Sequence, residues 1–136
     1  MASLEYISTL NSTNRQEWIN DVRHCISDLL TQCKLLNMEF QEPIQNEELK
    51  KKLHEKINYN RNKLRLLLSP QISQHENLLK STEELIGILE KHMNRSDHDV
   101  NEYDNFSFLQ KSDNIIDIGR ELLYFEWQKI QSMKFT

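Results

Sequence analysis

Apolar or core-type residues recur every three or four positions from Leu4 to Phe40, and this spacing constrains the fold more than any other feature. Such spacing keeps side chains on one face of an α-helix. The phase holds over eleven positions, namely Leu4, Ile7, Asn11, Asn14, Trp18, Val22, Cys25, Leu29, Cys33, Leu36 and Phe40. We therefore predict an unusually long first helix, against which the rest of the chain packs.

The scarcity of turn residues excludes a fold with many strands. The 136 residues include two Gly and two Pro, too few for the turns of a many-stranded sheet. With 38% hydrophobic and 28% charged residues, the composition is that of a globular protein rather than of a disordered chain. The sequence predicts one all-α domain over residues 1–136.

Capping signals and prolines divide the chain into four helices. The first should end before Pro43, because a residue that precedes proline avoids the α-helical region. Asn46 is a suitable N-cap for a second helix that Pro70 ends, and Ser73 and Ser107 open the third and fourth. The short connections between the first three helices make neighbours antiparallel. The sequence therefore predicts an up-down-up-down four-helix bundle.

The later helices carry their own core positions. Trp18 and Trp127 lie on or beside the stripes of the first and last helices, so we expect both indoles to be largely buried. Gly119 lies on the apolar face of the last helix, where the missing side chain would admit a neighbouring backbone or a Trp ring. The stripe of the second helix comprises Leu49, Leu53, Ile57, Asn60, Leu64 and Leu67.

The N-terminal end of the first helix is the predicted interaction site. A continuous helix from Leu4 to Phe40 measures about 55 Å, whereas helices of about 20 residues reach only about 30 Å. Residues 1–14 would then protrude as an arm with large apolar side chains, which suits docking onto a second chain. This homodimer seam or partner-docking arm comprises Leu4, Ile7, Leu10, Asn11 and Asn14, and the two asparagines would set its register.

An alternative structure for this end stays open. The run from Asn11 to Asn14 consists of weak helix formers, and Thr13 begins a capping-box pattern. The helix could therefore restart at Thr13 and fold a short helix over residues 3–10 back onto the core. Asn11 and Asn14 would then be ordinary solvent-exposed residues.

Charge is unevenly distributed along the chain. The net charge of −4 argues against a general nucleic-acid coat. Residues 46–66 nevertheless contain seven Lys or Arg and three Glu, whereas residues 97–126 contain eight acidic and two basic residues. A basic helix face can bind phosphate groups. The sequence thus offers an anion-binding set formed by Lys50, Lys51, Arg61 and Arg65.

Arg61 and Arg65 lie one turn apart on the predicted second helix. Two guanidinium groups at this spacing can clamp a phosphate or a carboxylate. We expect an acidic residue of the last helix, such as Asp113 or Asp117, to be their partner.

The sequence carries no complete catalytic or metal-binding motif. His54 and His75 are each followed by Glu, as in the helix of zinc proteases, but Asn58 and Leu79 replace the second histidine. Two isolated glycines cannot build a phosphate-binding loop. We expect no catalytic residue, cofactor or metal, and we expect the five histidines to lie at the surface or its boundary.

Cysteine and apolar patterns bear on the compartment. Cys25 and Cys33 would lie about 12 Å apart along one helix, too far for a disulfide. Buried free thiols are typical of a reducing compartment. The longest purely apolar run, residues 66–68, is far too short to cross a membrane. We therefore expect a cytoplasmic protein without membrane contact.

Three short landmarks give the chain a resemblance. The segment RQEWINDVR at Arg15–Arg23, the turn LLLSP at Leu66–Pro70 and the pair Glu126-Trp127 resemble a signature of uncharacterised bacterial helical proteins. Many of those proteins carry membrane segments before the Trp helix, and this chain has none. The resemblance implies a helical bundle of bacterial or phage-related origin, and it supplies no catalytic residue.

Together these features predict a non-enzymatic protein–protein interaction or assembly module that forms a homo-oligomer or binds another protein chain. The alternative is a nucleic-acid-acting component, such as a toxin or an anti-phage defence subunit, that uses the basic second helix.

Overall fold

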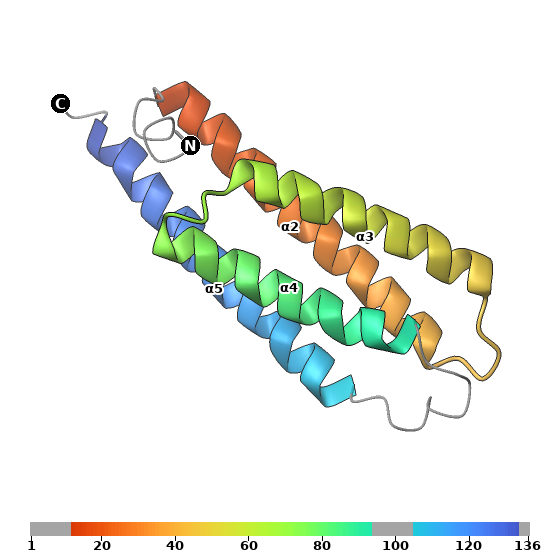
Figure 1. Cartoon of the computed structure of the whole chain (residues 1–136). Helices are drawn as coiled ribbons and strands as arrows, with labels where there is room; N and C mark the ends of the chain where they lie inside the picture. The colour runs from red at the N-terminus through yellow and green to blue at the C-terminus, as the bar shows by residue number, and fades with distance from the viewer. Residues whose placement is uncertain (1–11, 94–104, 134–136) are drawn as a thin grey trace.

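The computed structural model of the chain describes residues 12–93 and 105–133. These residues form four α-helices and no strand (Figure 1), which confirms the predicted all-α class. The helices are α2 (Ser12–Phe40), α3 (Glu47–Leu67), α4 (Ser73–Met93) and α5 (Asn105–Met133).

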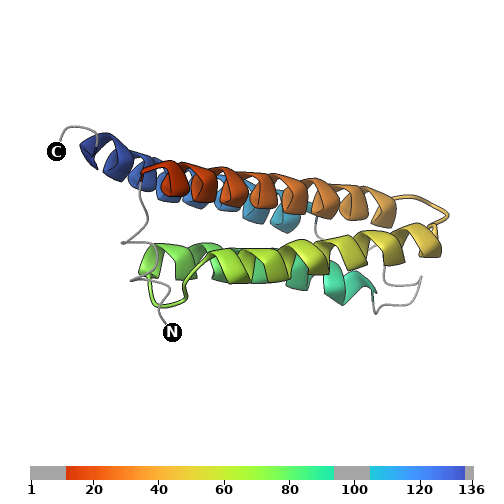
Figure 2. The ribbon, with the colours of Figure 1, turned by 90° about the horizontal axis from the view of Figure 1, so that it is seen from above.

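Consecutive helices run in opposite directions, so the predicted up-down-up-down bundle is confirmed (Figure 1). Figure 2 shows two layers, with α2 beside α5 in one and α3 beside α4 in the other. The most extensive contacts join α2 to α3, α4 to α5 and α2 to α5, whereas α3 and α4 touch less. The connections at residues 41–46 and 68–72 are short, and short connections place sequential helices side by side.

The helices fall into two length classes. α2 and α5 have 29 residues each, and α3 and α4 have 21 each, or about 43 Å against about 31 Å. The long first helix is confirmed. The last helix, α5, is as long as the described part of α2, because α5 begins at Asn105, ahead of the predicted Ser107. None of the described helices is both long and apolar enough to cross a membrane. Residues 1–11, which include most of the predicted arm, lie outside the described residues.

The core follows the predicted stripe of the first helix. All seven stripe positions that the structure describes from Trp18 onward are buried. Opposite them, α4 and α5 contribute fully buried aliphatic side chains to the same cluster. The buried stripe residues of α2 are Trp18, Val22, Cys25, Leu29, Cys33, Leu36 and Phe40.

The first turn of α3 departs from the predicted stripe, because Leu49 is exposed and Lys50 is buried. The Lys50 Nζ donates to Oε1 of Gln45 at 2.7 Å and forms an ion pair with Glu47 at 2.8 Å. It also lies 5.6 Å from the centroid of the Phe40 ring. The lysine stem can be buried because its ammonium group is fully engaged at the bundle end.

The N-terminal caps of α3 and α4 agree with the sequence to within one residue. The Oδ1 of Asn46 accepts the backbone N–H of Leu49 at 3.0 Å, so the predicted N-cap of α3 is confirmed. At α4, the N–H of Glu76 donates to the carbonyl of Ile72 at 2.9 Å. Ile72 therefore occupies the cap position, one residue before the predicted Ser73.

Candidate protein-interaction surface

The predicted anion-binding residues on α3 are engaged with carboxylates. Arg61 binds Glu83 of α4 in a bidentate manner, with Nε donating to Oε2 at 2.6 Å and Nη2 donating to Oε1 at 3.0 Å. Arg65 also binds Glu83, and Lys50 pairs with Glu47 as described above. Of the four predicted residues, Lys51 alone has no ion pair within the described part of the chain, and it is exposed.

The partner predicted for Arg61 and Arg65 was wrong. They do not bind the acidic residues of the last helix, Asp113 and Asp117. The helix beside α3 is α4, and α5 lies at the diagonal corner of the bundle (Figure 2). Burial opposes ionisation of Glu83, but the hydrogen bonds and charges of the two arginines outweigh it and hold the pKa of this carboxyl below its ordinary value. The hydrogen bond that Arg61 donates to Glu83 likewise raises the pKa of Arg61.

A second carboxylate completes this α3–α4 network. Glu90 accepts from His54 Nε2 at 2.9 Å and from Arg61 Nη1 at 3.4 Å. The ion pairs thus join α3 to α4, two neighbouring helices that pack less closely than α2 and α3 do. They engage Arg61 and Arg65, two of the seven cations on the basic stretch that the charge count suggested for nucleic acid.

A polar cluster is buried at the bundle end where α2 begins and α5 ends. His75 is fully buried, stacks on Trp18 and accepts the backbone N–H of Ser69 through Nδ1 at 3.0 Å. Burial, and secondarily the charge of Lys129, lower its pKa to about 4. The expectation of a surface or boundary histidine was wrong here. His75 cannot reach a substrate, because no part of it is exposed.

Glu126 belongs to the same cluster and explains the orientation of its neighbour. It is buried, lies 3.8 Å from Nη1 of Arg15 and accepts from Nζ of Lys129 at 3.2 Å. These two cations make burial of the carboxylate tolerable. The adjacent Trp127 is turned outward and is 40% exposed, so the predicted burial was right for Trp18 and wrong for Trp127.

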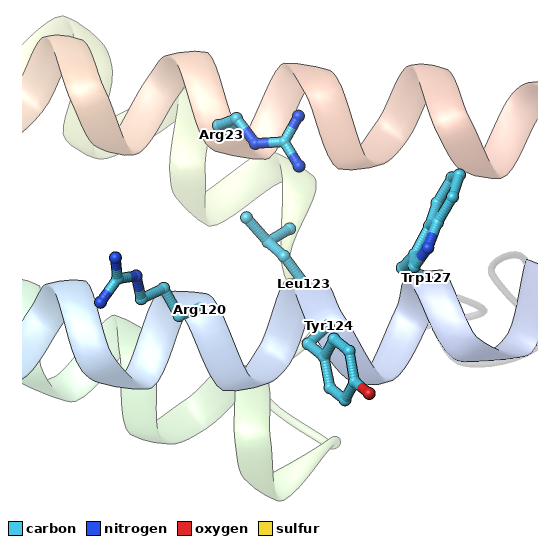
Figure 3. A pocket seen from close by; sticks show the side chains of 5 residues that line it. All are labelled: Arg23, Arg120, Leu123, Tyr124 and Trp127. Atoms are coloured by element: carbon cyan, nitrogen blue, oxygen red, sulfur yellow. The ribbon is translucent and has the colours of Figure 1, made fainter.

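The outward turn of Trp127 contributes to a groove between α2 and α5. One end, shown in Figure 3, is lined by Arg23 of α2 and by Arg120, Leu123, Tyr124 and Trp127 of α5. The indole of Trp127 points toward α2, and the ring of Tyr124 points away from α2. The volume of about 470 Å³ is that of a ligand pocket. However, Tyr124 is 63% exposed, so this end is an open surface and encloses no small molecule.

The groove continues along the same two helices. The two parts of the groove share the lining residues Arg23, Arg120 and Leu123. We name the two parts together the α2–α5 groove. A Cβ at Gly119 would lie 3.4 Å from Cδ1 of Ile26. The neighbour of this glycine is therefore an aliphatic side chain, rather than the predicted backbone or Trp ring. The further lining residues are Ile26, Ser27, Leu30, Thr31, Ile116 and Gly119.

The sequence-based site lay elsewhere. Leu4, Ile7, Leu10 and Asn11 are outside the described residues, and Asn14 is an exposed residue of α2. A signal for the groove did exist, because the apolar positions of the last helix come in adjacent pairs such as Ile115/Ile116 and Leu122/Leu123. Such a stripe is wider than one buried face requires.

The described residues offer neither a metal site nor a reactive cysteine. They contain no group of three or more His, Cys, Asp or Glu side chains that could hold a metal ion. Burial raises the pKa of Cys25 to about 11 and that of Cys33 to about 12. Neither thiol is therefore a nucleophile near neutral pH.

Comparison of the chain with protein families, curated proteins and solved structures gives no match. The resemblance to bacterial helical proteins accordingly stays a hypothesis, and a function has to be inferred from the surface of this chain.

Proposed function

We propose that this protein is a non-enzymatic helical assembly module that associates with a second copy of itself through the α2–α5 groove. The observation that carries the proposal is the exposure of Ile116, Tyr124 and Trp127 beside a bundle whose core is already filled. Large apolar side chains that gather on one exposed face are typical of a protein-binding surface.

The composition of the groove supports a protein partner. Tyr, Trp and Arg are enriched at protein interfaces and at their energetic hot spots, and Tyr124, Trp127, Arg23 and Arg120 line one end of the groove together. An elongated groove between two helices suits an amphipathic helix laid along it. A carboxylate on that helix would complement the two arginines.

The chain itself supplies such a helix. α5 is 29 residues long and carries exposed apolar side chains together with exposed aspartates, among them Asp113 and Asp117. The α5 helix of a second copy therefore matches the groove in charge. By contrast, three of the four cations expected to bind nucleic acid are already paired with carboxylates.

Sedimentation equilibrium over a wide concentration range tests this function. We expect a reversible dimer that Ile116→Asp converts to a monomer, because the substitution places a charge on the apolar groove wall. Leu66→Asp is the matched control, since Leu66 is 88% exposed on α3, a helix that does not line the groove. Circular dichroism melts establish that both variants are folded.

A monomer at every concentration would contradict the proposal. Salt-sensitive binding of that monomer to mixed RNA and DNA would favour the nucleic-acid alternative instead. Equal loss of the dimer in Ile116→Asp and Leu66→Asp would also count against the α2–α5 groove.

A further inference from the structure

The outward face of α5 carries a heptad pattern. Steps of three and four residues alternate without a break from Phe106 to Trp127, which is the spacing of helices that pair along a seam. Phe106 and Leu109 are 71% and 51% exposed, and Ile116 is also exposed. We name this set the α5 seam; it comprises Phe106, Leu109, Asp113, Ile116, Arg120, Leu123 and Trp127.

Two seam positions carry opposite charges. Asp113 and Arg120 stand seven residues apart on the same face, which separates their Cα atoms by about 10.5 Å. Both are exposed, and neither side chain forms an ion pair or hydrogen bond with another described residue. Charged residues at seam positions typically set the orientation and the partner of paired helices.

We propose that two copies of this chain pair their α5 seams in an antiparallel, two-fold symmetric arrangement, in which Asp113 of each copy lies opposite Arg120 of the other. The proposal rests on the proposed self-association and adds its geometry. A two-fold axis between Ile116 and Asp117 places residues at equal distances from that point opposite each other. Leu109 then lies opposite Tyr124, and Phe106 lies opposite Trp127.

The charges select this orientation over the parallel one. In a parallel pair, Asp113 would face Asp113 of the second copy, and Arg120 would face Arg120. Like charges across an interface are unfavourable, so the parallel arrangement is disfavoured. In the antiparallel pair, the dimer contains two complementary contacts between Asp113 of one copy and Arg120 of the other.

Arg23 strengthens the antiparallel arrangement from the opposite rim of the groove. It lines the α2–α5 groove together with Arg120, so Asp113 of the second copy meets one cation from each helix. Arg23 already donates to Oδ1 of Asn20 at 3.0 Å through Nη1. Four of the five guanidinium N–H donors remain for the carboxylate.

Charge exchange tests the orientation. We measure the dimer dissociation constant of the wild type, Asp113→Arg, Arg120→Asp and the double variant. Each single change turns two attractions into two repulsions, and we expect each to weaken the dimer about tenfold or more. The double variant restores both pairs, and we expect its constant to return to within about threefold of wild type.

The outcomes separate the two proposals. A monomeric wild type overturns both the self-association and the orientation. A wild-type dimer that neither single variant weakens, or that the double variant fails to restore, overturns the antiparallel seam and leaves self-association standing.

Cross-linking gives a second readout that does not depend on charge. The double variant Leu109→Cys/Tyr124→Cys should form a covalent dimer under mild oxidation, whereas Leu109→Cys alone should not. The native Cys25 and Cys33 do not compete, because both are buried. A covalent dimer of Leu109→Cys alone would indicate parallel helices and overturn the proposal.

Discussion

The imidazole of His75 stacks on the indole of Trp18, with ring centroids 5.5 Å apart and planes inclined by 20°. The stack joins the start of α4 to α2. Trp18 Nε1 donates to the carbonyl of Leu67 at 2.8 Å, and the N–H of Ser69 donates to His75 Nδ1 at 3.0 Å. Two buried rings thereby satisfy backbone groups of the α3–α4 connection, where helical hydrogen bonds end.

This geometry predicts that stability depends on the protonation of His75. Its pKa is about 4 in the folded protein against an ordinary 6.5, so the unfolded chain binds the proton more tightly. The contribution is complete above about pH 6.5 and is lost as pH falls toward about 4, by a total of about 3 kcal/mol. Urea unfolding at several pH values should show this slope in the wild type.

The control for this pH dependence is His75→Gln, which keeps an acceptor for Ser69 and cannot titrate in this range. We expect the variant to lose most of the stability slope between about pH 6.5 and about pH 4. The same slope in both proteins would exclude His75 as its source.

The two tryptophans should differ in their effect on stability. Trp18→Ala removes a side chain that is 7% exposed and also the hydrogen bond to Leu67, and we expect a loss of about 3–5 kcal/mol. Trp127→Ala alters a side chain that is 40% exposed, and we expect a loss of about 1 kcal/mol or less. Urea midpoints measure both; comparable losses would mean that Trp127 belongs to the core.

The sequence allowed the buried face of α2 to be predicted because one phase persists over seven positions, from Trp18 to Phe40. It could not decide between Glu126 and Trp127. Adjacent helical residues differ by about 100° in direction, so both positions border the same stripe. The choice depends on Arg15, which lies far away in the sequence and neutralises the buried carboxylate.

The error about Arg61 has another origin. Its partner was predicted from the net charge of the last segment, which is acidic. In a bundle of sequential antiparallel helices, however, the second and fourth helices lie at diagonal corners. The predicted topology therefore already favoured a carboxylate of α4, such as Glu83. The α2–α5 groove is lined by side chains that the core does not bury. Which side chains these are depends on how all four described helices pack together.

The network around Arg61 yields a stability prediction. Arg61→Met removes a bidentate pair with Glu83 and the contact with Glu90. Because these groups are partly exposed, we expect a loss of about 1–2 kcal/mol that shrinks at high salt. Lys51→Met, at an exposed position of the same helix, should change stability by less than about 0.5 kcal/mol. Equal effects of the two variants in urea unfolding would argue against the network.

The two glycines should respond differently to alanine. A Cβ at Gly87 meets nothing within 4 Å, so Gly87→Ala should stabilise the protein by about 0.5–1 kcal/mol through helix propensity. At Gly119 the new methyl group would contact Ile26 at 3.4 Å, and we expect a smaller gain. Thermal melts measure both, and a destabilised Gly87→Ala would show that this site is more crowded than the structure indicates.

Deletion of residues 1–11 distinguishes the predicted N-terminal arm from the α5 seam. The seam and the lining of the α2–α5 groove lie entirely within residues 23–127. We therefore expect the truncated protein to remain a dimer whose dissociation constant still rises in Asp113→Arg. Light scattering measures the mass of both. A folded truncated protein that is monomeric beside a dimeric parent would instead place the interface on the arm and its residues Leu4, Ile7 and Leu10.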